Sequence, residues 1–511
     1  MAFESILFSD GRAASDVDRA VEPDVFGDLN LDQVIHSVVV GRDDYNLKPL
    51  FYVPLTDAQA IGYRHEVMRD LERSKVLACI RDFAEQMRAM RTELAAAEKM
   101  HYRLQQQRYC LDAVQRYCAV LPGFARSLEE SAPASVGMKD FLAYLCSYVQ
   151  GPAFAELKSE EARHRENLGK VRYSVLIKGS AVTVRRYADE IDYTAEVQKT
   201  FEKFKQGAVK SHSTEIREYA EMNHVEANVL VFVARLHPEV FESLDEYCSA
   251  HADFLDSVIA RFDREIQFYV AYFEHLSRLR ATGLSFCYPA VSSESKAIRS
   301  TEGFDIALAD KLSREDQRVV CNDFYLEGKE RIIVVTGPNQ GGKTTFARTF
   351  GQLHYLAAVG WPVPGREANL YLFDQIFTHF ERQEDMKNLR GKLHDDLFRI
   401  HKILGRANTR SIIVMNEIFS STSLKDALFL SEKVMSRIMK LDALCVYVTF
   451  IEELSTLSAQ TISMLSEVKP DAVASRTFRI VRRPADGRSY ALTLARQYRL
   501  TYEQLRERIA S

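Results

Sequence analysis

A glycine-rich loop ends in lysine and threonine in the C-terminal half of the chain. Residues 337–344 read Gly-Pro-Asn-Gln-Gly-Gly-Lys-Thr, which satisfies the pattern G-x-x-x-x-G-K-[ST]. Glycines let backbone N–H groups curl around phosphate oxygens with no side chain in the way. Lys343 would bring a positive charge to the β- and γ-phosphates, and the Thr344 hydroxyl could join the shell of a Mg²⁺ ion. The loop therefore predicts a site for a nucleotide.

The context of this loop supports the same prediction. The apolar run 332–335 before it is typical of a buried strand, and we expect a helix to begin near Thr345. A helix N-terminus directed at the loop adds the positive end of its dipole to an anion site. The expected cofactors are ATP and Mg²⁺. The predicted nucleotide-binding residues are Gly337, Pro338, Asn339, Gln340, Gly341, Gly342, Lys343, Thr344 and Thr345.

A second candidate element is the segment 411–417, in which the apolar run 412–415 is followed by Asn416 and Glu417. A strand that ends in two polar residues suits a site where the first residue holds Mg²⁺ through water and the second positions the attacking water. Glu417 can serve as that general base. Asn416 stands where aspartate is expected, and its amide oxygen can still accept a hydrogen bond from a metal-bound water without adding charge. We predict Glu417 as the catalytic residue, with Thr344 and Asn416 on the metal side.

Long helical stretches precede these elements. Residues 63–121 and 239–282 contain neither glycine nor proline, and their apolar residues recur at the spacing of a helix stripe. A single helix from about 76 to 120 would be roughly 65 Å long, and Pro122-Gly123 is expected to end it. A lever made of two long helices and an ordinary helical bundle both fit this periodicity.

Between the helical stretches lies a basic segment. Residues 171–187 are rich in β-branched side chains around Lys178-Gly179-Ser180, which predicts a hairpin. From residue 163 to 187 there are seven basic residues and one acidic residue, a net charge of +6 in a chain whose net charge is −4. Phosphate contact and a plain solvated face are equally compatible with this charge. The seven candidates for nucleic-acid binding are Arg163, Arg165, Lys170, Arg172, Lys178, Arg185 and Arg186.

The order of these elements predicts an α+β multidomain fold. The chain has 511 residues, too many for one hydrophobic core. Short apolar runs at 332–335, 412–415 and 444–448 alternate with helical stretches, which indicates parallel strands of an α/β domain. We expect an irregular leading segment over 1–50, a helical part over 51–300 with the hairpin inside it, and the α/β P-loop domain over 301–511.

The composition of the chain limits its expected location and its expected partners. No apolar run approaches the roughly 18 residues that span a bilayer, and the first residues carry acids where a signal peptide needs basic ones. We therefore expect a cytoplasmic chain with no membrane partner. None of the eight cysteines forms a Cys-x-x-Cys pair, which favours free thiols over zinc ligands or disulfides. The net charge of −4 excludes a polycation, so nucleic acid could bind only through a local patch.

Several segments resemble the MutS family, in the family's order, between residue 331 and about 505. Residues 335–345 resemble T-G-P-N-x-G-G-K-S-T, 374–378 resemble D-x-I-F-T, 416–423 resemble D-E-[IL]-x-x-x-T-S, 448–454 stand where the family has T-H-x-x-E-L, and 489–491 resemble its closing S-Y-G. The resemblance implies an ABC-type P-loop ATPase domain after a helical core and lever, with a shortened clamp around 125–235. It also implies a homodimer through the ATPase domains, whose helical arms close on duplex or branched DNA when ATP binds.

Departures from the family pattern modify this expectation. Asn416 replaces the metal-side aspartate, and Phe450 replaces the histidine that would sense the γ-phosphate. The segment 388–396 lacks the family's Ser-Thr, so a trans contact there would rest on backbone N–H groups and Asn388. The chain has no room before residue 50 for mismatch-reading and connector domains, which favours a MutS-like ATPase paralogue over a mismatch sensor. The alternative is a slowly hydrolysing nucleotide switch that acts on RNA, ribosomes or a protein partner.

Overall fold

The computed structural model describes residues 3–9, 17–179, 181–188, 196, 222–381, 391–468, 476–484, 501–502 and 505–506. The chain divides into two units. The helical unit contains Met1–Phe3, Arg73–Pro133 and Met138–Asp263, and the sheet unit contains Glu4–Glu72, Ala134–Gly137 and Arg264–Ser511. Helices and mixed sheets together confirm the α+β class.

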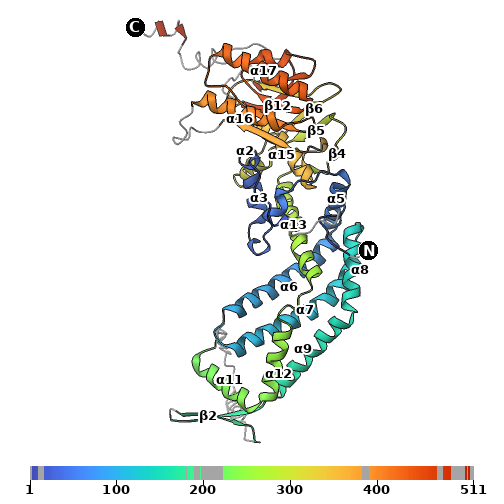
Figure 1. Ribbon diagram of the computed structural model, residues 1–511, viewed down its shortest axis with the longest axis vertical. Coiled ribbons are helices and arrows are strands. Elements are labelled where there is room, and N and C mark those ends of the chain that lie inside the picture. The colour runs from blue at the N-terminus through green and yellow to red at the C-terminus, as the bar shows by residue number, and fades with distance from the viewer. Residues whose placement is uncertain are drawn as a thin grey trace, which may run out of the picture. The chain divides into compact units, whose positions relative to one another are not determined.

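The helical unit is built from helices that lie side by side, with α6, α7 and α9 the longest that fall wholly within it (Figure 1). Its helices are α6 (Ser74–Lys99), α7 (Arg103–Ser131), α8 (Val136–Val149), α9 (Pro152–Lys170), α11 (His224–Leu236), α12 (Pro238–Ala250) and the first turns of α13 (Ser257–Arg280). Phe83 of α6 stacks on Phe124 of α7 with ring centroids 4.0 Å apart. The apolar stripes of the two helices therefore bury each other.

The single helix expected from about 76 to 120 is wrong. The chain turns at residues 100–102, where Met100 and Tyr102 have extended backbones, and α7 folds back against α6. The stripe has the same period in both helices, so periodicity hides a turn that contains neither glycine nor proline. Pro122 does not end the helix either, because it lies inside α7 among buried residues that hold the helix together. The stretch 239–282 is likewise two helices, α12 and α13, separated by residues 251–256.

The predicted hairpin is present in the helical unit. Strand β1 (Tyr173–Lys178) pairs antiparallel with β2 (Ala181–Arg186), and Lys178 lies opposite Ala181. The turn between them contains Gly179, whose φ of 64° lies in the left-handed region that glycine adopts without strain. Alternation along a strand places Lys178 and Arg185 on one face of the hairpin and Arg186 on the other.

The sheet unit is organised around a six-stranded sheet with the order β10-β11-β12-β7-β13-β14 (Figure 1). All neighbours are parallel except β13 and β14. The strands are β7 (Ile332–Thr336), β10 (Ile376–Phe380), β11 (Ile412–Asn416), β12 (Leu444–Val448), β13 (Thr461–Val468) and β14 (Arg476–Arg482). The three apolar runs of the sequence form β7, β11 and β12, and every residue of these strands is buried, as expected where helices cover both faces of a sheet.

Helices lie on both faces of this sheet. The helices α16 (Lys392–Arg406) and α17 (Leu424–Leu441) pack on one face, where Ile400 and Ile438 join a core with Ile332, Val334 and Tyr447. The helix α15 (Lys343–Val359) contacts β11 and β12 and is buried along nearly its whole length. The ends of β7, β11 and β12 are therefore fixed by packing on both sides of the sheet.

Smaller elements complete the sheet unit. A four-stranded sheet has the order β4-β9-β5-β6, and β3 pairs with β8. These strands are β3 (Phe286–Cys287), β4 (Ala290–Ser292), β5 (Ile298–Gly303), β6 (Asn322–Leu326), β8 (Val363–Pro364) and β9 (Glu367–Tyr371), and the short helix α14 (Ile306–Ser313) lies between β5 and β6 in the chain. Among the described helices, none combines the length and the apolar composition of a membrane span.

The N-terminal part is more regular than the sequence suggests. Within the predicted irregular segment the chain forms α2 (Val25–Leu29), α3 (Leu31–Val39), η1 (Asp43–Tyr45) and α4 (Lys48–Tyr52), followed by α5 (Ala58–Glu72). Asn30 and Asn46 have φ of 53° and 46° and end α2 and η1 in left-handed conformations. Helices this short are too brief to show a clear period, which explains the wrong expectation.

Candidate nucleotide site

The loop 337–342 connects the end of β7 with the start of α15. Gly337 and Gly342 have φ of 121° and 92°, and Gln340 has φ of 61°. Gly341 donates its backbone N–H to the Pro338 carbonyl at 3.2 Å, which closes a turn inside the loop. The strand–loop–helix order expected from the sequence is present, with α15 beginning at Lys343 rather than near Thr345.

Two glycines of the loop touch the neighbouring strand β13. A Cβ at Gly337 would lie 2.8 Å from the Cβ of Ser466, and one at Gly341 would lie 2.3 Å from its Oγ. The Ser466 hydroxyl donates to the Gly341 carbonyl at 2.8 Å. Ser466 therefore shapes the loop, and no sequence motif marks it, because the contact joins residues far apart in the chain.

Lys343 reaches back under the loop. Its side chain is only 3% exposed, and Nζ donates to the carbonyls of Gly337 at 3.0 Å and Pro338 at 3.1 Å. The same nitrogen lies 3.4 Å from Asn339 Oδ1 and 3.5 Å from Glu417 Oε1. The predicted phosphate-binding cation and the predicted base are thus brought together.

The predicted metal-side residues also meet. The Thr344 hydroxyl donates to Asn416 Oδ1 at 3.0 Å. Asn416 is the last residue of β11 and is 7% exposed. Thr345 sits one residue further into α15, where its carbonyl accepts from the Thr349 hydroxyl at 2.9 Å. An adjacent hydroxyl and amide oxygen are ligands of the kind that Mg²⁺ and its bound waters take in proteins.

The segment after β11 holds Glu417 in an unusual backbone conformation. Glu417 and Phe419 have φ of 54° and 60°. The Glu417 N–H donates to the Val448 carbonyl at the end of β12, at 3.0 Å. The Glu417 carboxylate therefore projects from an anchored loop at the carboxyl ends of the strands, where the loop 337–342 also lies.

The remaining positions that the MutS pattern marks are Phe450, Asn388 and the segment 489–491. Phe450 follows β12 and is 49% exposed, and the Thr449 N–H before it donates to the Val335 carbonyl at 3.0 Å. This hydrogen bond places Phe450 close to the end of β7, but the phenyl ring has no group that can donate or accept a hydrogen bond. Asn388 and the segment 489–491 lie outside the described residues.

The seven basic candidates do not form one uniform surface. Three lie on α9 and have acidic partners: Arg163 with Glu160 at 3.5 Å, Arg165 with Glu161 at 2.7 Å and Asp112 at 3.0 Å, and Lys170 with Glu166 at 2.6 Å. Arg186 donates to the Leu236 carbonyl through Nε at 3.0 Å. Arg172, Lys178 and Arg185 are exposed and have no acidic partner within the described ranges.

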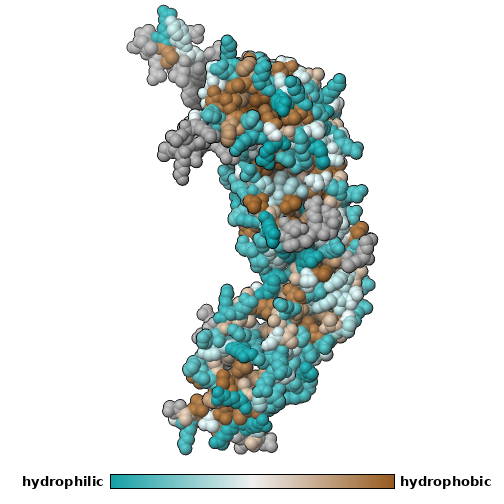
Figure 2. All heavy atoms as spheres, in the orientation of Figure 1, coloured by the Kyte–Doolittle hydropathy of each residue, from teal (hydrophilic) through white to brown (hydrophobic). Residues whose placement is uncertain are grey.

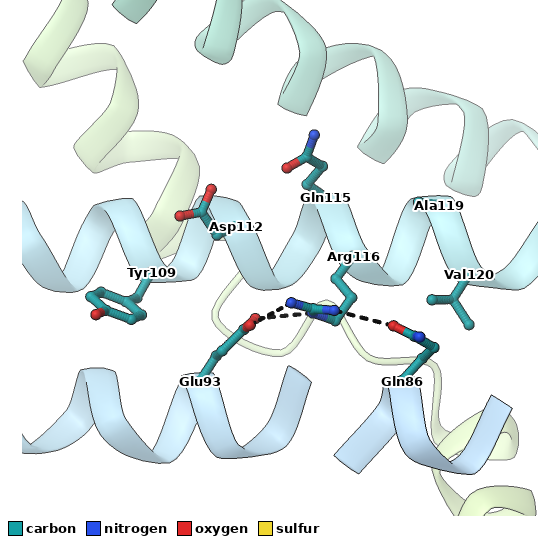
Figure 3. A pocket seen from close by; sticks show the side chains of 8 residues that line it. All are labelled: Gln86, Glu93, Tyr109, Asp112, Gln115, Arg116, Ala119 and Val120. Carbon is teal, nitrogen blue, oxygen red and sulfur yellow. Dashed lines mark hydrogen bonds and ion pairs between the residues drawn. The ribbon is translucent and has the colours of Figure 1, made fainter. Parts of the chain in front are cut away.

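A polar cavity of about 440 Å³ lies in the helical unit, between α6 and α7. Figure 3 shows Arg116 of α7 reaching across to Glu93 and Gln86 of α6, and its Nη2 lies 2.6 Å from Glu93 Oε1. The Arg108 Nε donates to Asp112 Oδ2 at the rim at 2.9 Å. The charged groups of this cavity already pair with one another, so we assign it no chemistry.

The comparisons with known proteins agree with the sheet unit's geometry. The MutS domain V family matches residues 333–503. The DNA mismatch repair protein MutS of Thermotoga maritima is 25% identical over 310 residues, which cover 59% of this chain and 36% of that protein. The protein of the same name from Erythrobacter litoralis is 30% identical over 225 residues, 42% of this chain and 25% of that protein.

The longest of these similarities reaches into the helical unit. The DNA mismatch repair protein MutS of Thermotoga neapolitana is 25% identical over 360 residues, 67% of this chain and 42% of that protein. The matched part of the chain thus spans less than half the length of these relatives. Residues 333–503 include nearly the whole loop-bearing sheet edge, with Lys343, Asn416, Glu417 and Phe450. On this match, residues 333–503 belong to the MutS domain V family, and over a longer stretch the chain is similar to proteins named DNA mismatch repair protein MutS.

Proposed function

We propose that the sheet unit is a P-loop ATPase domain that binds ATP with Mg²⁺ and hydrolyses it. The observation that supports this most strongly is that four side chains meet at the carboxyl ends of the central strands. Lys343 lies 3.5 Å from Glu417, and Thr344 lies 3.0 Å from Asn416, although the two pairs join segments more than 70 residues apart in sequence. Each of the four has the side-chain chemistry that phosphoryl transfer to water needs.

The residues divide the work as follows. Backbone N–H groups of 337–342 and the N-terminus of α15 would bind the phosphates, and Lys343 would neutralise the β- and γ-phosphates. The donor set of Thr344 and Asn416 fits Mg²⁺, which when bound supplies charge neutralisation at the phosphate oxygens. Glu417 would orient a water molecule and accept its proton as it attacks the γ-phosphate.

The expected DNA partner rests on a separate argument. The relatives are named DNA mismatch repair proteins, and we propose that this chain also binds DNA, as duplex or branched structures. Arg172, Lys178 and Arg185 are the basic residues of the hairpin region that are exposed and lack acidic partners in the described structure. They are the best placed of the seven candidates to neutralise phosphates.

A homodimer through the sheet units is part of the proposal. Exposed apolar side chains gather on α16 and α17, namely Leu397, Phe398, Leu424 and Phe429. Figure 2 shows a hydrophobic area on the face where Figure 1 labels these two helices. Apolar surface of this kind is typical of protein–protein contacts. Light scattering with ATP and Mg²⁺ should then report twice the mass of the 58.4 kDa chain.

A slow nucleotide switch is the second candidate. Asn416 adds no charge beside the metal, and the exposed Phe450 ring offers no hydrogen bond to a γ-phosphate. Both features favour ATP binding over rapid hydrolysis. In this version the bound nucleotide, rather than its turnover, would control a partner that is RNA, a ribosome or a protein.

One experiment tests the first candidate and separates it from the second. ATP hydrolysis is measured for the wild-type chain and for Glu417→Gln. Binding of both proteins to duplex, mismatched, four-way and single-stranded DNA is measured with and without ATP. The proposed ATPase predicts that Glu417→Gln binds ATP, loses hydrolysis and remains as a closed dimer. Tight ATP binding with negligible wild-type turnover and no DNA binding would support the switch instead.

A further inference from the structure

A buried histidine and aspartate lie behind the segment that carries Glu417. His379 is on β10 and is 1% exposed, and Asp396 is on α16 and is 8% exposed. His379 Nε2 lies 3.2 Å from Asp396 Oδ1. Neither ring nitrogen of His379 is aligned for a hydrogen bond within the described ranges, so the two side chains are in close contact without one. Placing a carboxylate out of water is costly unless other groups contact it.

The second oxygen of Asp396 reaches the main chain after β11. Asp396 Oδ2 accepts the backbone N–H of Phe419 at 3.4 Å. Phe419 is two residues beyond Glu417, and both have positive φ. Side-chain-bearing residues adopt that region only when surrounding contacts hold them there. The hydrogen bond from Phe419 is such a contact.

The segment is thus anchored at two points. The Glu417 N–H donates to the Val448 carbonyl at 3.0 Å, and the Phe419 N–H donates to Asp396. The helix that carries Asp396 is itself tied to β10, because Arg399 donates to the Phe380 carbonyl at 3.2 Å. Ile418 and Phe419 are buried, so the segment has a packed side as well. These contacts leave the Glu417 carboxylate as the part that faces Lys343.

We propose that Asp396, with His379 beside it, is a positioning residue for Glu417. Asp396 does not touch the Glu417 side chain; it fixes the backbone from which that side chain projects. The inference rests on the proposed role of Glu417 as the group that orients the attacking water. It predicts that Asp396 affects the hydrolysis step and leaves nucleotide affinity alone, because Lys343 is also held by the carbonyls of Gly337 and Pro338, which Asp396 does not contact.

The test uses Asp396→Ala and Asp396→Asn in the full chain, with Asp395→Ala as the control. Asp395 is the preceding carboxylate on the same helix and is less buried. Asp396→Ala should lower single-turnover ATP hydrolysis by roughly 10- to 100-fold, the scale of a small misplacement of a catalytic group. Asp396→Asn should lose less, because its amide oxygen can still accept from Phe419. ATP affinity should be unchanged in all three variants.

A double-mutant cycle with Glu417→Gln separates positioning from general weakening. If Asp396 acts through Glu417, Asp396→Ala should cause little further loss in the Glu417→Gln background. A further loss of the same factor, or a fall in ATP affinity that matches the fall in rate, would overturn the inference. If Asp396→Ala fails to fold, the same cycle with Asp396→Asn measures the coupling instead.

Failure of the underlying function has a different signature. If the wild-type chain and Glu417→Gln hydrolysed ATP at the same rate, both the proposed base and this inference would be overturned. Hydrolysis that requires Glu417 but proceeds at the parental rate in Asp396→Ala and Asp396→Asn would overturn the inference alone.

Discussion

The ammonium nitrogen of Lys343 lies 3.5 Å from a carboxylate oxygen of Glu417. The group proposed to bind phosphate and the group proposed to position water therefore attract each other in this conformation. Lys343 also donates to two loop carbonyls, so its charge is satisfied by the protein itself. We infer that a nucleotide would compete for Lys343 with these partners, and that the competition would release Glu417 toward a water molecule.

Lys343→Ala should abolish nucleotide binding and leave the fold intact. A hydrogen bond to a charged group is worth roughly 1.5–3 kcal/mol, and Lys343 would serve two phosphates, so affinity should fall about 100-fold or more. Fluorescent ATP-analogue titration measures the affinity, and circular dichroism checks the fold. Lys329→Ala, at an exposed turn, is the matched control. Retained affinity in Lys343→Ala would count against the site.

Asn416→Asp tests the departure from the family pattern. An aspartate at this position could still accept from the Thr344 hydroxyl and would add a carboxylate beside Mg²⁺, a metal that favours such hard ligands. We expect tighter Mg²⁺ binding and equal or faster hydrolysis. The competing outcome is repulsion between the new carboxylate and Glu417, which would raise the pKa of Glu417. Hydrolysis measured against Mg²⁺ concentration at two pH values decides, and a slower enzyme with an upward-shifted profile would contradict our expectation.

Lys178→Gln with Arg185→Gln should weaken DNA binding and its dependence on salt. The two residues share one face of the hairpin and lack acidic partners in the described structure. Removing two phosphate contacts should reduce the slope of log affinity against log salt by about 1.8. The control is Arg163→Gln with Lys170→Gln, which removes the same charge from ion-paired residues on α9. Equal effects from both pairs would show that only total charge matters.

Acid should destabilise the sheet unit through buried histidines. Burial lowers the pKa of His65, His275 and His354 to about 4 in each case, against about 6.5 in an unfolded chain. Between these values the unfolded chain binds more protons than the folded one, so stability falls as pH falls from about 6.5 toward 4. Unfolding midpoints from pH 7.5 to 4.5 measure this fall.

The matched variants for this effect are His354→Gln and His401→Gln. His354 is fully buried and His401 is exposed, and both are on helices of the sheet unit. His354→Gln should flatten the decline with pH, whereas His401→Gln should keep it. A decline of equal size in all three proteins would mean that other groups cause it.

What the sequence predicts well is local. Strand β7, the loop 337–342 and the start of α15 are contiguous, so their residue types show the arrangement directly. The apolar runs of β11 and β12 are visible for the same reason. The turn at residues 100–102 escapes prediction because α6 and α7 share one period and bury their stripes against each other.

What the sequence could not predict depends on contacts across long separations. Ser466 meets Gly341, and Asp396 meets Phe419, only because neighbouring strands and a covering helix bring them together. The family pattern suggests a trans contact for the segment 388–396, whereas its Asp396 lies against buried groups of its own unit. The ion pairs that occupy Arg163, Arg165 and Lys170 cannot be distinguished from free charges in the sequence.

The contact of Ser466 with Gly337 and Gly341 means that the phosphate-loop motif is not self-sufficient. A fragment ending before Thr461 would contain every residue of the motif, yet it would lack β13, which pairs with β7 along its length. Strand β7 would become an edge strand, and Gly337 and Gly341 of the loop would lose their packing against Ser466. Recombinant boundaries for this unit should therefore be chosen by the sheet rather than by the motif.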